Sequence, residues 1–202
     1  TPDATEMLYD AMHKFPDAGF YYTDSAEVDQ NWESLTYGGG FAMGYGAYRD
    51  ESALGMDFKV QVTPNLNPKT IRHIVGVPNH IRAWRRNLYY QIGGHNRGLS
   101  IADDYELLVR TFLNTKMCRI QKLGYIQFIY DDASGTNTHN SSRRDIQRRV
   151  RTVADYYSEA ITKRFEDLGL EDWAAGVPGQ LVADVPSRFD DEECAANYNY
   201  IP

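Results

Sequence analysis

The chain has few cysteines, no long apolar run and no excess of positive charge, and each absence argues against a class of protein. Its 202 residues include two cysteines, Cys118 and Cys194, neither of which belongs to a C-x-x-C pair. A cysteine-bound zinc site is therefore not expected, and free thiols in a reducing, cytoplasmic compartment are the default, with a disulfide as the alternative. No apolar run approaches the length of a membrane span and no signal peptide is visible, so no membrane-crossing segment is predicted.

The charge of the chain argues against nucleic acid as a partner. A net charge of −7 at pH 7 repels the phosphate backbone, whose attraction to basic proteins supplies most non-specific binding. The glycine-rich residues 37–46 are not followed by the GKS or GKT sequence of a phosphate-binding P-loop, so that motif is not predicted either.

The residues that are present suffice for a folded domain of mixed secondary structure. Hydrophobic residues make up 42% of the chain, and helical and alternating patterns are interspersed along it, which indicates the α/β class. We expect one domain over residues 1–170 and an acidic, irregular tail over residues 171–202. The expected helices cover residues 4–15, 79–92, 103–111 and 142–169, and the expected strands cover residues 19–23, 56–62, 116–120 and 125–130.

The most informative segment runs from Gly93 to Arg110. Two glycines make a loop, a short polar connection follows, and Asp103 and Asp104 open an amphipathic helix. An acidic first turn is common in helices because it complements the helix dipole. The alternative is that one carboxylate takes a proton from a hydroxyl group that attacks an electrophilic carbon. The flanking residues, Gly93 and Gly94 before the acids and Tyr105 and Arg110 after them, favour the alternative.

The same segment resembles the acceptor side of a family 2 glycosyltransferase with the GT-A fold. The resemblance implies a mixed sheet flanked by helices, a long C-terminal helix, and inverting transfer of a sugar from a nucleotide-sugar donor to a glycan or other hydroxyl acceptor. Asp104 matches the second acid of the family's pair, its catalytic base, and Asp103 stands where a glutamate is more usual. The implied substrate-binding residues are Trp84, Gly93, Gly94, His95 and Arg110; for His95 a surface role is the alternative. The matched residues are Trp84-Arg85, Tyr90 to Asn96, Leu99, Ala102 to Leu107, and Arg110.

Weaker resemblance on both flanks extends the match to about residues 1–165. Residues 15–24 resemble the strand after the family's metal-binding motif, which implies that Asp24 touches the nucleotide or sugar; a strand-end turn residue is the alternative. Residues 138–142 resemble the family's His/Asn/Ser loop. His139 would then complete the coordination of Mn or Mg on the nucleotide diphosphate, where the ion neutralises the leaving group. An exposed loop histidine is the equally weighted alternative.

The family's Asp-x-Asp motif is missing from residues 1–100, and the nucleotide-binding strands that carry it would precede Thr1. We therefore expect an upstream segment or a protein partner to cover the sheet edge that would otherwise lie open. The second hypothesis is a non-catalytic carbohydrate-binding or structural protein that retains part of the GT-A scaffold. The Gln-x-x-Arg-Trp signature of processive synthases is absent, so a polymerising membrane enzyme is not supported.

Two further sets of residues have more than one interpretation. In the basic run that begins at Arg143, Arg143 or Arg144 can hold a diphosphate through forked hydrogen bonds. A solvated helix face is favoured for this run, and a nucleic-acid patch is opposed by the net charge. Trp84 and Tyr90 can stack on a sugar, although aromatic residues at helical spacing more often belong to the core.

Overall fold

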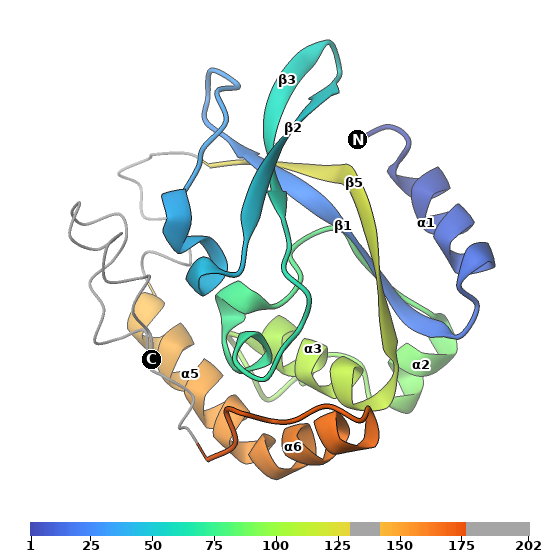
Figure 1. Cartoon of the computed structure of the whole chain (residues 1–202), viewed down its shortest axis with the longest axis vertical. Coiled ribbons are helices and arrows are strands. Elements are labelled where there is room, and N and C mark those ends of the chain that lie inside the picture. Colours follow the sequence, from blue (N-terminus) through green and yellow to red (C-terminus); the bar gives the residue numbers. More distant parts are fainter. Residues whose placement is uncertain (130–141, 177–202) are drawn as a thin grey trace.

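The computed structural model describes residues 1–129 and 142–176, and Figure 1 shows an open, mixed sheet with helices on both of its faces. The central strand is β1 (Ala18–Val28), which is buried along its whole length. It pairs in parallel with β5 (Lys116–Phe128) and antiparallel with β4 (Arg82–Trp84) and β3 (Met56–Val62). β3 pairs in turn with β2 (Ala47–Ala53), which completes a sheet of five strands. The predicted α/β class is confirmed at this level.

Side chains of β1 alternate between two cores because successive residues of a strand point to opposite faces. Phe20 and Tyr22 belong to the large core, which contains residues of the helices α3 (Asp103–Asn114), α5 (Arg143–Tyr156) and α6 (Ser158–Asp167). Tyr21 points the other way and packs with Ala11 of α1 (Ala4–Lys14). One aromatic run in the sequence therefore serves both faces of the sheet.

β5 is one continuous strand, so the prediction of separate strands over residues 116–120 and 125–130 was wrong. Ile120 pairs with Thr23, Leu123 with Asp24 and Tyr125 with Ser25. Three residues of β5 in this stretch therefore have no paired residue on β1. The strand bends at this point (Figure 1). A bulge of this kind interrupts the alternation of side chains, which is why the sequence pattern suggested two strands.

The predicted helix over residues 79–92 was also wrong in its first half. Arg82–Trp84 form β4, which pairs with Phe20–Tyr22, and only Arg86–Gln91 are helical, as α2. Trp84 and Leu88 are spaced as on a helix, but pairing with the buried centre of β1 decides the conformation of the first half. The end of the helix is confirmed, since α2 stops just before Gly93.

The predicted long C-terminal helix is divided into α5 and α6, with Tyr157 between them. Apolar residues lie at helical spacing on both sides of the division, so the sequence does not reveal it. Short 3-10 helices complete the fold: η1 (Gly38–Gly44), η2 (Thr70–Arg72) and η3 (Ile74–Gly76). Within the described residues, no helix has both the length and the apolar character that a membrane span requires.

A buried ion cluster lies where three strands meet. Asp24 of β1 has no exposed side-chain surface, and Arg119 of β5 donates to its two oxygens at 2.9 and 2.8 Å. Arg49 of β2 forms a second ion pair with the same carboxylate, and the Thr63 amide donates to it at 3.2 Å. Glu51 neutralises the second charge, since its carboxylate accepts a hydrogen bond of 3.0 Å from Nε of Arg49. The cluster therefore satisfies a charge that would otherwise be very unfavourable in the core.

We expect Asp24→Asn to lower the free energy of unfolding by about 3 kcal/mol, because two partly buried arginines would lose their shared carboxylate. Urea denaturation measures this change. The matched control is Asp50→Asn, since Asp50 follows Arg49 on β2 and makes an exposed ion pair with Lys59. An Asp24→Asn protein as stable as the control would contradict a structural role for Asp24.

His73 gives a second prediction, on pH. Its side chain is buried, and burial together with the charges of Lys69 and Arg72 lowers the pKa of His73 to about 4 from 6.5. Between these pH values the unfolded chain binds a proton that the folded chain does not, so stability falls as the pH is lowered through this window. The full effect is about 3 kcal/mol.

We expect His73→Gln to lose this part of the pH dependence, which urea denaturation at pH 4.5 and pH 7 measures. His13→Gln serves as the control because His13 lies exposed on α1. Equal pH dependence in the His73 variant and the unmodified protein would show that His73 does not remain neutral in the fold.

Candidate functional site

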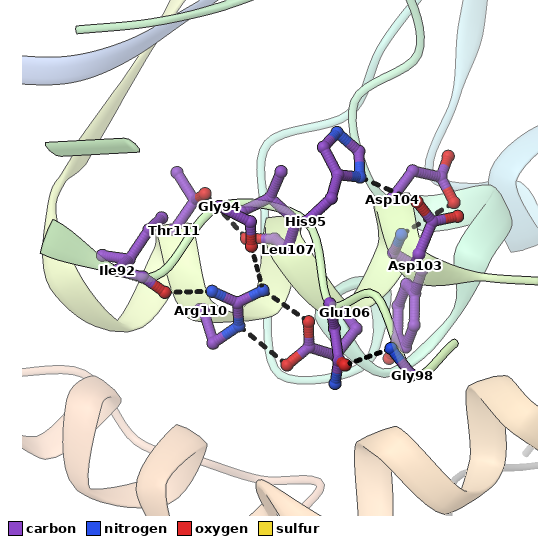
Figure 2. A network of polar contacts seen from close by, with 12 residues as sticks. Ile92, Gly94, His95, Gly98, Asp103, Asp104, Glu106, Leu107, Arg110 and Thr111 are labelled. Carbon is purple, nitrogen blue, oxygen red and sulfur yellow. Dashed lines mark hydrogen bonds and ion pairs between the residues drawn. The ribbon is translucent and has the colours of Figure 1, made fainter. Parts of the chain in front are cut away.

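The candidate site lies at the start of α3, where the predicted acid pair opens the helix (Figure 2). Ala102 precedes the helix with a left-handed φ of 57°, and Asp103 and Asp104 are its first two residues. The helix then buries Tyr105 and Leu107 in the core, which anchors it. The two acidic side chains remain 39% and 40% exposed, so a ligand can reach them.

Asp104 is held by contacts on both of its oxygens. Its Oδ1 accepts a hydrogen bond of 2.8 Å from the Tyr105 amide, and its Oδ2 forms an ion pair of 2.8 Å with Arg82. Arg82 is 10% exposed, and its Nε donates to the Pro78 carbonyl at 2.8 Å. The carboxylate is therefore oriented from the protein side while part of it faces solvent. Such an arrangement can accept a proton or a hydrogen bond from a hydroxyl group.

Arg82 and its neighbour His80 were missed by the sequence analysis, which placed Arg82 in a helix. β4 brings Arg82 to Asp104 from 22 positions earlier in the chain. The His80 ring lies 5.2 Å from the ring of Tyr125. Burial and the charge of Arg82 lower the pKa of His80, while Asp104 opposes that shift. His80 is therefore a neutral imidazole at neutral pH.

Asp103 has a different partner from Asp104. Its carboxylate lies 2.8 Å from Nδ1 of His95, and both side chains are partly exposed. The backbone amide of His95 donates to the Tyr89 hydroxyl at 3.3 Å. A carboxylate on Nδ1 favours the tautomer in which Nε2 is free to accept a hydrogen bond. The structure thus brings His95 to the acid pair.

The predicted glycine turn joins α2 to this site. Gly93 and Gly94 have φ values of +87° and +61°, and a Cβ on Gly94 would approach the Tyr89 ring to 2.9 Å. Arg110 of α3 binds the turn by donating to the Gly94 carbonyl at 2.7 Å and to the Ile92 carbonyl. The guanidinium of Arg110 therefore holds the loop in place, and its donors are directed at protein atoms.

Four further candidate residues lie apart from the acid pair or outside the described residues. Asp24 is buried in the ion cluster with Arg49 and Arg119. Arg144 is exposed near the start of α5, and the side chain of Arg143 is not described. His139 lies outside the described residues, so its prediction as a metal ligand stays a prediction. In residues 1–129 and 142–176, no group of three or more His, Cys, Asp or Glu side chains is arranged to hold a metal ion.

Trp84 packs into the core and also borders a hollow of about 670 Å³ beside α2. Its indole N–H donates to the Thr111 hydroxyl at 2.8 Å, and its ring lies 4.7 Å from that of Phe20. Tyr90 is 66% exposed on the same hollow. The hollow does not include the acid pair; its lining residues are Met12, Trp84, Arg85, Arg86, Asn87 and Tyr90.

No family model matches this chain, and no curated protein sequence is significantly similar to it.

Proposed function

We propose that this chain is the acceptor-side portion of a glycosyltransferase with the GT-A fold, similar to family 2, in which Asp104 is the general base. The observation that carries the proposal is a carboxylate at an exposed helix start, oriented by Arg82, whose neighbour Asp103 contacts His95 directly after the Gly-Gly turn. The orientation of Asp104 removes the need to order the carboxylate during the reaction.

The proposed reaction is the inverting transfer of a sugar from a nucleotide-sugar donor to a hydroxyl acceptor. The acceptor oxygen forms its bond to the anomeric carbon as Asp104 takes the hydroxyl proton. The bond between that carbon and the leaving diphosphate oxygen breaks, and its electron pair leaves with the diphosphate. Attack from the side opposite the leaving group inverts the configuration of the carbon. Asp103 and Arg110 orient the loop and the helix around this step.

The donor side of the reaction is assigned to residues beyond the acid pair. A divalent ion, Mn²⁺ or Mg²⁺, with His139 as one ligand, would stabilise negative charge on the leaving diphosphate. Arg143 and Arg144 would hold the same group through forked hydrogen bonds. These assignments are supported by the resemblance of the sequence alone.

A further part of the proposal concerns the edge of the sheet at β4. Of the described strands, β4 pairs with β1 and with no other. β5 likewise pairs with β1 alone among these strands, and we propose that the edge at β4 accepts a further strand. We assign this edge to an upstream segment or a protein partner, which would also supply the nucleotide-binding residues.

Asp104→Asn tests the assignment of the base in the full gene product, assayed with labelled nucleotide-sugar donors and a panel of glycan acceptors. The amide keeps the shape of the side chain but cannot take the proton, so we expect kcat to fall about 100- to 10,000-fold. Donor binding, measured by calorimetry, should be unchanged because the substituted group acts on the acceptor.

Asp103→Asn is the matched control, since it changes the neighbouring carboxylate and leaves Asp104 in place. We expect a smaller loss of kcat than for Asp104→Asn. Undiminished transfer by Asp104→Asn would overturn the assignment of the base. Glycan binding without transfer from any donor would instead favour the second hypothesis, a non-catalytic carbohydrate-binding protein.

A further inference from the structure

We propose that Tyr157, at the division between α5 and α6, positions the loop that carries His95 by acting through Glu106 and Arg110. This inference rests on the proposed function for its catalytic consequence, because His95 and Asp103 lie beside the assigned base. The contacts themselves are independent of that function. They form a continuous path from the C-terminal helices to the acid pair.

The path is centred on Glu106, whose side chain is 6% exposed. Both of its oxygens accept hydrogen bonds from Arg110 (Figure 2). The bond from Nε is 2.7 Å long and the bond from Nη2 is 2.6 Å long. A buried carboxylate needs such contacts to remain charged, so Glu106 fixes the plane of the guanidinium. The two residues are four positions apart on α3, a spacing that brings side chains together on one helix face.

Tyr157 adds a third hydrogen bond to the same carboxylate. Its hydroxyl donates to Oε1 of Glu106 at 2.8 Å across 51 positions of the chain. Burial and the neighbouring Glu106 raise the pKa of Tyr157 to about 12, so the hydroxyl keeps its proton at neutral pH and remains a donor. Tyr157 is the residue at which α5 ends and α6 begins. The division between the two helices therefore falls at the residue that reaches α3.

The other end of the path is the glycine turn. Arg110 donates to the carbonyls of Ile92 and Gly94, the latter at 2.7 Å. His95 follows directly, and its Nδ1 lies 2.8 Å from the carboxylate of Asp103. A change in the angle of the guanidinium would move these carbonyls and the imidazole beside them. Tyr157 thereby sets the position of His95 without touching any group that reacts.

The test compares Tyr157→Phe with Tyr156→Phe in the full chain. Tyr156 is the adjacent tyrosine and is 80% exposed, so its variant makes the same chemical change away from Glu106. The first readout is the ¹⁵N NMR spectrum of the His95 ring, which reports the population of the Nδ1–H tautomer. We expect this population to fall in Tyr157→Phe and to stay unchanged in Tyr156→Phe, with both variants folded as judged by circular dichroism.

The second readout is transfer activity in the full gene product. We expect Tyr157→Phe to lower kcat/KM for the acceptor about threefold to tenfold, because the loss of one hydrogen bond to Glu106 reaches His95 only through Arg110 and the turn, and to leave the KM of the donor unchanged. An effect through Glu106 also predicts that Tyr157→Phe has no further influence on His95 in a Glu106→Gln background.

The NMR readout separates this inference from the proposed function. A fall in the Nδ1–H population in a protein that transfers no sugar would support the path and reject the glycosyltransferase. An unchanged His95 spectrum in Tyr157→Phe would overturn the path, whatever the activity. Equal effects of Tyr157→Phe and Tyr156→Phe would overturn it as well, since Tyr156 does not contact Glu106.

Discussion

The charge of Asp24 in the middle of β1 is the constraint on which the arrangement of the sheet depends. The carboxylate has no exposed surface, and the two arginines that neutralise it come from β2 and β5. Glu51, which pairs with Arg49, also accepts a hydrogen bond of 3.0 Å from the Leu123 amide. That amide belongs to the part of β5 where the register with β1 shifts. The bulge in β5, the β2–β3 hairpin and the register of β1 therefore have to form together, because an incomplete cluster leaves a buried ion unpaired.

The sheet positions the candidate site through β4. Once β1 is in place, antiparallel pairing aligns Tyr22 with Arg82, and the side chain of Arg82 reaches Asp104 on α3. α3 is itself held by burial of one face in the large core, while its first turn stays at the surface. Two adjacent carboxylates thus acquire separate partners, Arg82 for Asp104 and His95 for Asp103. Separate partners are what allow two identical side chains to perform different roles in one site.

Most elements with strong local signals were predicted from the sequence. The helix at residues 4–15, the helix that opens at Asp103 and the end of a helix before Gly93 are all present. The errors share one physical cause. Residues 79–85 became a loop and a strand, β5 became one strand with a bulge, and the C-terminal helix divided at Tyr157. In each case a contact with residues distant in sequence stabilises the observed conformation. That contact contributes more than the local preference for the predicted conformation.

For the candidate site, the sequence by itself determined that a glycine turn precedes a helix whose first turn carries Asp103 and Asp104. It did so because glycine, helix-start charge and apolar spacing are local properties of the chain. Only the tertiary structure decided that Asp104 pairs with Arg82, that Asp24 is buried between two arginines, and that Tyr157 reaches Glu106. These contacts join residues 22 to 95 positions apart, and such distances are closed by sheet pairing and core packing rather than by local pattern.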